Sequence, residues 1–341
     1  MFANIFIISF SIFLILFFIL RKFNILVDNR ELSFHKKLVI FSSKPILMGG
    51  IYILALILVS FPKDYLFLKL ITFLILLIGI LSDVDYLKSP FKRIIIQCFL
   101  VLFFVLIENI FIRSLSIDFL DNLLKINVIN IILTIFCFLV LINGTNFLDG
   151  LNGLASGYYI ISIISILFLA DQNLINLLYQ KEITYLLIGL IIFFVFNMLG
   201  LTFLGDGGAY ILAAIIGYIF ISNFNSNLSI SPYFIALLLW YPAFENLFSL
   251  SRRLLSKIKV SEPDNLHLHQ LIYLKIKNKI INNKLTNSIT SIVILIYNLS
   301  ILIVATHNYS STKIMAGLIV FNVFVYSSLY YFFSKYSEQN K

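Results

Sequence analysis

Charged residues are scarce in this chain of 341 residues, where Asp, Glu, Lys and Arg together make up 12% of the sequence. An ordinary soluble domain carries about 25%. Hydrophobic residues instead account for 60%, and the mean hydropathy is +1.00. These figures exclude a water-soluble globular protein with a conventional surface. They predict one integral membrane domain over residues 1–341, with little room for a separate soluble domain.

Cysteine is also scarce, since only Cys98 and Cys137 are present and both lie inside apolar runs. The sequence therefore favours neither a disulfide framework nor a soft-metal site. The formal net charge of +9 is compatible with a nucleic-acid partner. In a membrane protein, however, such an excess more often reflects loops retained on the cytoplasmic side. We expect no nucleic acid among the partners.

Long apolar runs fill the chain, and a helix needs about 20 apolar residues to cross the hydrocarbon core. The sequence predicts an all-α, multi-pass fold of about eleven transmembrane helices. The first run has no basic flank and no small-residue cleavage site, so we expect a retained anchor. The expected spans are residues 3–20, 46–61, 65–81, 94–112, 127–142, 153–170, 184–199, 208–222, 232–250, 288–306 and 313–333.

Lys and Arg are distributed unevenly over the loops between these spans. With the N-terminus outside, 19 of the 25 Lys and Arg residues lie in the inside loops and the C-terminal tail. Cytoplasmic loops of membrane proteins usually carry such an excess. The bias predicts an outside N-terminus and places the acidic motifs described next on the cytoplasmic face.

Three carboxylate-bearing segments lie at the ends of apolar runs. Charged groups at or near a bilayer are costly, so a functional site is the default interpretation. Asp206 is flanked by glycines that permit close backbone approach, and Mg²⁺ prefers a few carboxylate oxygens together with water and phosphates. A helix N-cap explains Asp206 equally well when it is taken alone. The segments are Ser82-Asp83-Val84-Asp85, Asn143–Gly153 and Phe203–Gly208.

The segment Asn143–Gly153 carries the strongest signal, because Asn143, Asn146, Asp149 and Asn152 interrupt two apolar runs together with three glycines. Polar, non-helical backbone near a membrane is tolerated where it is buried in protein or lines a wet cavity. A simple inside loop does not need this density of Asn and Gly. The segment therefore indicates a site rather than a plain turn.

Basic side chains accompany the acidic motifs. Asp83 is followed by Lys92, which suits either interfacial ion pairs or a phosphate-and-metal site. His267 and His269 lie in the last long inside loop without the further ligands that zinc needs. We interpret both as hydrogen-bond donors to phosphate or sugar, and a basic loop that binds anionic lipid is the alternative. Glu245 and Arg252 fall on one helical face, which predicts a structural ion pair.

In this order, the residues resemble the polyprenyl-phosphate N-acetylhexosamine-1-phosphate transferases, bacterial membrane enzymes of the glycosyltransferase 4 type. The family usually has an Asp-Asp pair where this chain has Ser82-Asp83. Gln270 replaces the last histidine of the loop motif, which favours the undecaprenyl-phosphate GlcNAc-1-phosphate transferase-like branch. The resemblance extends over nearly the whole chain. Its motifs are Asp28…His35…Pro45…Gly49-Gly50, Ser82-Asp83…Lys92…Gln97, Asn143–Gly153, Phe203–Gly208 and Arg252-Arg253…Asp264…His267-Leu268-His269.

The resemblance implies an enzyme of the bacterial cytoplasmic (inner) membrane. It would transfer an N-acetylhexosamine-1-phosphate from a UDP-N-acetylhexosamine to undecaprenyl phosphate, release UMP and start a cell-envelope polysaccharide such as lipopolysaccharide O-antigen. The implied cofactor is Mg²⁺, with Mn²⁺ as an alternative. Membrane lipids are expected partners, and a homodimer is left open.

The resemblance also implies roles for individual residues. The catalytic candidates are Asp83, Asp149 and Asp206, of which Asp206 and Asp149 are the metal candidates. A transporter or flippase for a lipid-linked or anionic solute is the alternative function, but transporter sites tend to lie near the bilayer midplane. The substrate-binding candidates are Asn143, Asn146, Asn152, Arg252, His267, His269, Lys92 and His35.

Overall fold

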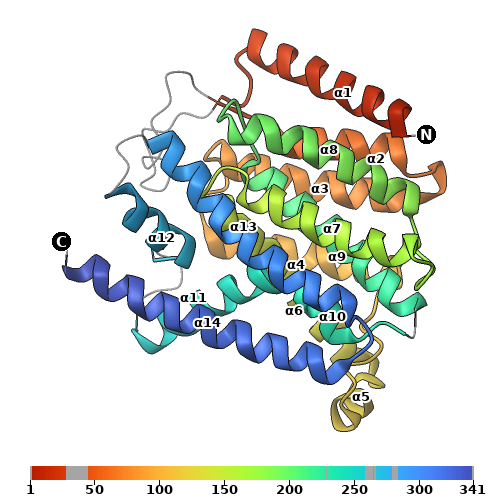
Figure 1. Cartoon of the computed structure of the whole chain (residues 1–341). Coiled ribbons are helices and arrows are strands. Elements are labelled where there is room, and N and C mark those ends of the chain that lie inside the picture. Colours follow the sequence, from red (N-terminus) through yellow and green to blue (C-terminus); the bar gives the residue numbers. More distant parts are fainter. Residues whose placement is uncertain are drawn as a thin grey trace.

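The computed structural model describes residues 2–27, 45–227, 229–257, 264, 266–278 and 283–339. Within these residues the chain is built from α-helices, with one 3₁₀ helix (η3, Lys63–Tyr65) and two strands of two residues each. Figure 1 shows the helices as one bundle. The all-α prediction is confirmed. The helices are α1 (Phe2–Lys22), α2 (Gly49–Ser60), α3 (Leu66–Asp83), α4 (Pro90–Ile107), α5 (Asp118–Leu124), α6 (Asn127–Leu148), α7 (Leu154–Asp171), α8 (Gln180–Met198), α9 (Gly205–Ser226), α10 (Pro232–Leu238), α11 (Trp240–Leu255), α12 (Leu268–Lys277), α13 (Asn283–His307) and α14 (Thr312–Gln339).

Each of the predicted spans coincides with a helix or a helix pair. Among the described residues, nine helices are long and apolar enough to cross a membrane, and α2 is a shorter apolar helix of 12 residues. The span predicted over residues 232–250 is broken, because α10 and α11 meet at an angle of 78°. Pro242 lies in the first turn of α11, and a proline ring clashes with the carbonyl four residues before it. The two short helices α5 and α12 were not predicted.

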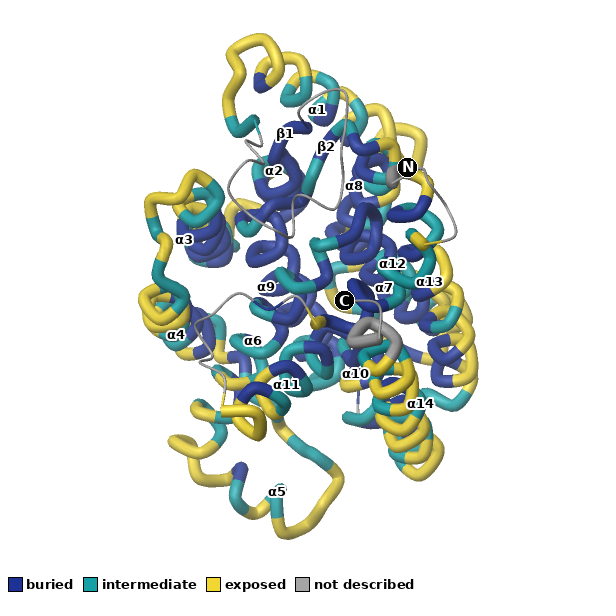
Figure 2. Tube along the Cα trace, turned by 90° about the vertical axis from the view of Figure 1, so that its left-hand side faces the viewer, coloured by how far each residue is buried: buried dark blue, intermediate teal, exposed yellow. Residues whose placement is uncertain are grey.

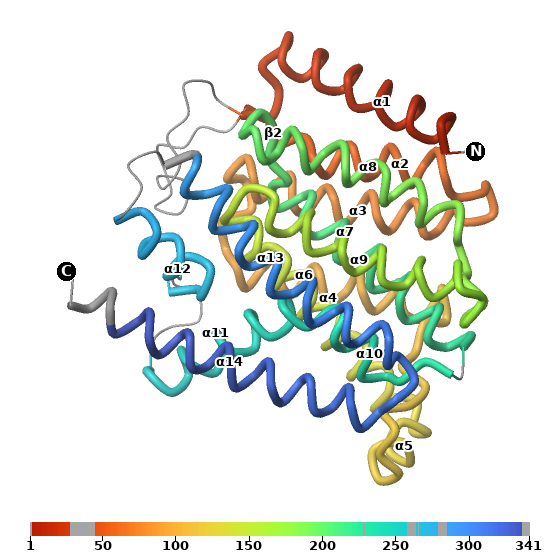
Figure 3. Tube along the Cα trace, in the orientation of Figure 1, coloured from red at the N-terminus to blue at the C-terminus, as the bar shows by residue number. Residues whose placement is uncertain are grey.

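The chain ends lie at opposite ends of the bundle. In Figures 1 and 3, α1 begins at one end, and α14 ends at the other, on the same side as α12. The helix α5 lies away from α12, near the end where α1 begins. If the two ends of the bundle face the two sides of the membrane, the chain has to cross the membrane an odd number of times. This agrees with the eleven predicted spans. The outside location of the N-terminus stays a prediction.

The helix α9 forms the centre of the bundle. Its most apolar 18-residue window is 89% buried inside the protein, against 22% for α1 and 17% for α14. Figure 2 shows α9 almost wholly in the colour of buried residues, with exposed residues along the outer helices. The outer helices expose large apolar side chains such as Phe18 and Phe324. Hydrocarbon accommodates such a surface, and water would not.

Glycines let the helix backbones approach closely where α9 begins. A Cβ added to Gly79 of α3 would lie 2.2 Å from the Cα of Gly207, and one added to Gly50 of α2 would lie 2.8 Å from the carbonyl carbon of Gly207. Small residues allow such close contacts between membrane helices. The start of α9 is therefore held directly between α2 and α3.

A short parallel pairing fixes the chain just before these helices. The strand β1 (Ile46–Leu47) pairs with β2 (Thr202–Phe203), with Ile46 opposite Thr202. The two strands precede α2 and α9 respectively. The pairing sets where α9 starts relative to the rest of the bundle.

Candidate active site

The turn that opens α9 depends on a glycine. Gly205 has φ of +72°, a conformation that side chains other than glycine rarely adopt. A Cβ at Gly205 would also lie 2.8 Å from Oδ2 of Asp83. The glycine therefore allows the chain to turn tightly and to place Asp206 in the first turn of the helix.

Asp83 and Asp149 hold this turn by its backbone. Asp83, the last residue of α3, accepts hydrogen bonds from the amide of Asp206 at Oδ1 (3.0 Å) and from the amide of Gly207 at Oδ2 (3.2 Å). Asp149 follows α6 and accepts a hydrogen bond from the amide of Gly205 (2.9 Å). The first amides of a helix have no partner inside it, and its N-terminus attracts negative charge. The two carboxylates therefore fix the position of Asp206.

The carboxylate of Asp206 is where four helices meet. Its Oδ1 accepts a hydrogen bond from Asn146 Nδ2 of α6 (2.7 Å). Its Oδ2 accepts from Ser82 Oγ of α3 (2.5 Å) and from Arg93 Nη1 of α4 (2.9 Å). The side chain remains 25% exposed, so a soluble ligand can reach it. Asp83, Asp149 and Asp206, the three catalytic candidates, are thus brought together at the ends of α3, α6 and α9.

Arg93 is a site residue that the sequence reasoning did not select. Lys92, which was selected, is exposed, and its backbone amide lies 3.4 Å from Ser89 Oγ at the helix N-cap. Arg93 points inward with Gln97, one turn later, which is fully buried. The sequence did contain a signal for Arg93. Gln97 is a polar residue four positions later, and residues four apart lie on the same helical face.

The amide side chains of α6 have two different roles. Asn146 contacts Asp206, whereas Asn143 donates to Gln97 Oε1 (3.1 Å) and to the carbonyl of Leu139 (2.9 Å). Asn143 therefore links α6 to α4, the helix that carries Arg93. Asn143 therefore stabilises the packing around the site, but its side chain does not contact the carboxylate of Asp206.

A second polar cluster surrounds Glu245 of α11, whose side chain is almost fully buried. Its Oε1 lies 3.0 Å from His267 Nδ1 and accepts the amide hydrogen of Leu268 (3.3 Å). Its Oε2 lies 3.8 Å from His269 Nδ1. Glu245 thus orients His267 and lies close to His269. The predicted Glu245–Arg252 ion pair is wrong, because α12 brings two histidines to Glu245 and Arg252 contacts another carboxylate.

That other carboxylate is Asp264. It accepts hydrogen bonds from Ser249 Oγ (2.5 Å), from the guanidinium of Arg252 and from Arg253 Nε (3.3 Å). Burial alone would raise the pKa of Asp264, but the nearby His267, the Ser249 hydroxyl and Arg252 lower it to about 2. The carboxylate is therefore ionised at neutral pH and joins Asp264 to α11.

The two clusters converge on the end of α6. The ring centroids of Phe147 and His267 lie 4.5 Å apart, and a Cβ at Gly150 would lie 3.3 Å from His269 Nε2. Burial lowers the pKa of His269, against the opposing effect of Glu245. Neither ring nitrogen of His269 makes a hydrogen bond with any described residue. The fully buried ring of His269 thus lies beside Gly150, with no hydrogen-bond partner among the described residues.

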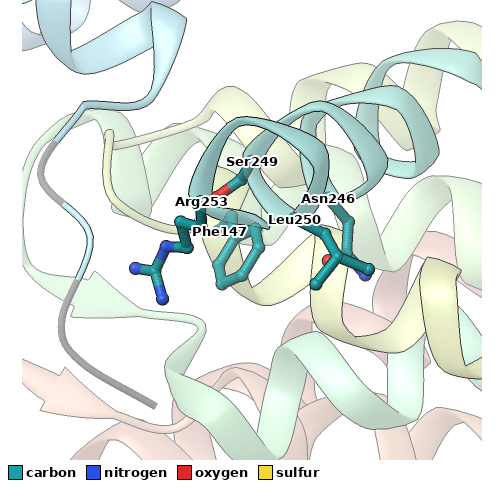
Figure 4. Close-up of a pocket in the computed structure, with 5 residues that line it drawn as sticks. All are labelled: Phe147, Asn246, Ser249, Leu250 and Arg253. Carbon is teal, nitrogen blue, oxygen red and sulfur yellow. The ribbon is translucent and has the colours of Figure 1, made fainter. Parts of the chain in front are cut away.

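A pocket opens beside this convergence, between α6 and α11. Figure 4 shows the ring of Phe147 against α11, with Arg253 on one side and Leu250 on the other. Asn246 and Ser249 complete the lining. The pocket therefore combines a cation with apolar side chains.

The remaining predicted residues are Asn152 and His35. Asn152 is buried, and its backbone amide donates to Asn287 Oδ1 of α13 (2.7 Å). His35 lies outside the residues that the structure describes. Asn152 therefore contributes to the packing of the loop after α6 against α13.

The donor atoms near Asp206 fit a hard cation. In the described ranges, no three His, Cys, Asp or Glu side chains form a ready metal cluster. Mg²⁺ usually needs only one or two carboxylates, because waters and substrate phosphates complete its shell. The partly exposed carboxylate of Asp206 meets that need, and Asp149 lies nearby, bonded to the amide of Gly205. Soft ligands are absent from these contacts, so the chemistry favours Mg²⁺ or Mn²⁺ over zinc.

Comparison with known proteins agrees with this geometry. A sequence profile of glycosyl transferase family 4 matches residues 65–223, which include the three aspartates, Arg93 and the segment 143–153. The matched residues are therefore similar to glycosyl transferase family 4. The resemblance noted from the motifs is thereby confirmed. The cluster around Glu245 lies beyond the matched residues.

Three curated proteins are similar to this chain. A probable undecaprenyl-phosphate N-acetylglucosaminyl 1-phosphate transferase of Bacillus subtilis is 26% identical over 200 residues, covering 58% of this chain and 55% of the relative. An undecaprenyl-phosphate alpha-N-acetylglucosaminyl 1-phosphate transferase of Thermotoga maritima is 30% identical over 140 residues, covering 41% and 42%. A phospho-N-acetylmuramoyl-pentapeptide-transferase of Dictyoglomus thermophilum is 29% identical over 190 residues, covering 53% and 60%. The chain thus spans about half the length of the relatives it matches.

Proposed function

We propose that this protein transfers an N-acetylhexosamine-1-phosphate from a UDP-N-acetylhexosamine to undecaprenyl phosphate in the bacterial inner membrane and releases UMP. The observation that carries the proposal is the turn Gly205–Gly207, which Asp83 and Asp149 hold so that Asp206 faces Arg93 and Asn146. The turn lies within the part of the chain that is similar to glycosyl transferase family 4. The names of the relatives from Bacillus subtilis and Thermotoga maritima favour undecaprenyl phosphate as the acceptor and N-acetylglucosamine as the sugar.

The proposed reaction is an exchange of one phosphorus–oxygen bond for another. An oxygen of the acceptor phosphate attacks the sugar-bearing phosphorus of the donor. The bond from that phosphorus to the bridging oxygen breaks, and the oxygen leaves with its electron pair as part of UMP. The product is a lipid pyrophosphate that carries the sugar. No proton has to move, because a phosphate monoester with a second pKa near 6 is mostly ionised at neutral pH.

The residues of the site supply positioning and charge in this reaction. Asp83 and Asp149 keep the turn in place, and Asp206 would hold the divalent cation. When bound, Mg²⁺ would offset the negative charge of the donor pyrophosphate. Arg93 adds a guanidinium that can bind two phosphate oxygens at once. Positioning and electrostatic stabilisation account for most of the rate in such phosphoryl transfers.

The second cluster would bind the UDP-sugar. His269 offers hydrogen-bonding atoms beside Gly150, and Glu245 orients His267 next to Phe147. Arg252 is committed to Asp264, so in this proposal it positions the loop instead of contacting the donor. The donor would then lie between the histidine loop and the turn of α9.

The pocket beside α11 suits the acceptor. Undecaprenyl phosphate has an anionic head and a long apolar chain. Arg253 and Phe147 line the pocket, and beyond it α11 exposes Leu254 and Leu255, which are 64% and 85% exposed. Such a helix can lie in the membrane interface with its apolar side toward the lipid. The head would then reach the site while the chain stays in the membrane.

A transporter or flippase remains the alternative. Transporter sites tend to lie near the midplane on discontinuous helices. Here Asp83 is the last residue of α3, Asp149 directly follows α6, and Asp206 lies in the first turn of α9. The acidic residues therefore lie at helix ends, which favours the enzyme.

A radiolabel transfer assay tests the proposal. Purified protein, undecaprenyl phosphate and Mg²⁺ are offered a panel of UDP-N-acetyl sugars, and label is counted in the lipid phase. We expect transfer from at least one donor, with UMP released in equal amount. Asp206→Asn should lose it, while Asp85→Asn, the same chemical change at an exposed position, should retain it.

The outcomes separate the functions. Transfer that persists in Asp206→Asn at the wild-type rate would contradict the role of Asp206. No transfer with any donor, from protein that still binds the lipid, would favour the transporter. The donor that transfers best would also identify the sugar and hence the class of polysaccharide that is started.

A further inference from the structure

The carboxylate proposed to hold the cation is already neutralised by a side chain of the protein itself. Arg93 Nη1 lies 2.9 Å from Asp206 Oδ2, and the two side chains are 22% and 25% exposed. Ser82 bridges the pair, since its Oγ lies 2.5 Å from Asp206 Oδ2 and 2.5 Å from Arg93 Nη1. The oxygen that faces Ser82 and Arg93 is therefore occupied by two donors.

The other oxygen of Asp206 has its own donor. Asn146 Nδ2 lies 2.7 Å from Oδ1. Three donors therefore occupy three of the roughly four lone-pair sites of the carboxylate, and a divalent cation that uses the site left on Oδ1 has to share the group with the positively charged guanidinium. Cation and guanidinium also repel each other at this range. The metal and Arg93 therefore compete for Asp206.

We infer that Arg93 is an internal counter-ion of the metal site, which Mg²⁺ must displace from Asp206 and which then becomes a phosphate ligand. The inference rests on the proposed function and extends it to one residue. Arg93 lies in the first turn of α4 after its Ser89 N-cap, so its backbone stays fixed when its side chain swings. The released guanidinium remains beside the carboxylate, where donor or acceptor phosphate would bind.

The competition has a measurable size. A ligand that needs a minor state binds more weakly in proportion to the fraction of that state. If the partly exposed ion pair contributes about 1 kcal/mol, the apparent metal affinity is reduced about fivefold. Removing the guanidinium should therefore raise the apparent metal affinity. A substitution of Arg93 that keeps a positive charge should leave the affinity low.

Metal binding without substrate tests the inference. Purified, EDTA-treated protein in detergent is titrated with Mn²⁺, and free Mn²⁺ is measured by electron paramagnetic resonance with no nucleotide or lipid present. We expect Arg93→Gln to bind Mn²⁺ about fivefold more tightly than wild type. Arg93→Lys, which keeps a cation, should stay near wild type, and so should Lys88→Gln, which removes an exposed positive charge from the preceding loop.

A second readout separates this role from a purely structural one. Without metal, Arg93→Gln should melt at a lower temperature, because Asp206 loses its counter-ion, and added Mn²⁺ should raise that temperature more than in wild type. In the transfer assay, the same variant should show a raised KM for the UDP-sugar. A structural defect would lower stability at every metal concentration alike.

The failure of the inference differs from the failure of the proposed function. Equal Mn²⁺ affinities in Arg93→Gln and Lys88→Gln, with binding lost in Asp206→Asn, would overturn the counter-ion role and leave the transferase intact. Weaker binding in Arg93→Gln would overturn it as well. Absence of sugar transfer by the wild type would instead contradict the proposed function.

Discussion

Replacing Asp83 by Asn should loosen the first turn of α9. Asp83 accepts the amides of Asp206 and Gly207 at 3.0 and 3.2 Å. Asn keeps one carbonyl oxygen as an acceptor. Its NH2 group takes the place of the second oxygen, so a donor then faces a backbone amide donor. A hydrogen bond to a charged group contributes about 1.5–3 kcal/mol, and a charge near a helix N-terminus adds about 0.3–1 kcal/mol. We therefore expect local stability to fall by about 2 kcal/mol.

Amide hydrogen exchange measures this loss where it occurs. Since 1.4 kcal/mol is a factor of ten, exchange at Asp206 and Gly207 should accelerate about thirtyfold, provided that these amides exchange by local opening. Sugar transfer should also fall, because the turn no longer fixes the carboxylate of Asp206. The buried middle of α9 should exchange as in wild type.

Asp85→Asn is the matched control. Asp85 is two residues away and exposed, and no side-chain hydrogen bond joins it to the described part of the chain. Its substitution should change local stability by less than about 0.5 kcal/mol. Unchanged exchange at Asp206 and Gly207 in Asp83→Asn would refute the anchoring role of Asp83. Equal losses of transfer in both variants would show that the general acidity of the segment matters instead.

Three further perturbations test other parts of the site. Gly205→Ala should reduce transfer and thermal stability, because φ of +72° and the contact with Asp83 leave no room for a methyl group; a fully active variant would contradict this. Glu245→Gln should raise the KM for the UDP-sugar and destabilise the buried histidine cluster by about 2 kcal/mol, which kinetics and melting can check against exposed Asp85→Asn. EDTA should stop transfer and Mg²⁺ or Mn²⁺ should restore it, whereas a rate without metal would exclude the cation from the reaction.

The sequence was sufficient for the architecture because the membrane imposes strong local constraints. Each span has to be apolar and helical over its own length, so runs such as residues 127–142 and 288–306 could be recognised without knowing their neighbours. The break in 232–250 was not predicted, although Pro242 lies inside that run and a proline in a helix interior kinks or breaks the helix. The clustering of Asp, Asn and Gly near span ends was also readable, because polar groups near a bilayer are costly.

The different roles of the polar residues could not be predicted from the sequence. Nothing in the sequence says that Asp83 and Asp149 accept backbone amides while Asp206 accepts hydrogen bonds from side chains of three other helices. That difference depends on the close approach of Gly79 to Gly207, a contact between positions far apart in the chain. The choice of Arg93 over its neighbour Lys92 depends on how α4 is rotated against α3 and α9.

The sequence by itself thus determined a multi-pass helical membrane protein whose acidic motifs lie at helix ends, because hydropathy and charge cost act on each segment separately. The tertiary structure alone decided which partner each polar group takes. Arg93 reaches Asp206, Glu245 binds His267, and Arg252 binds Asp264. Such pairings follow from the packing of distant helices, and side-chain hydrogen bonds form only within about 3 Å.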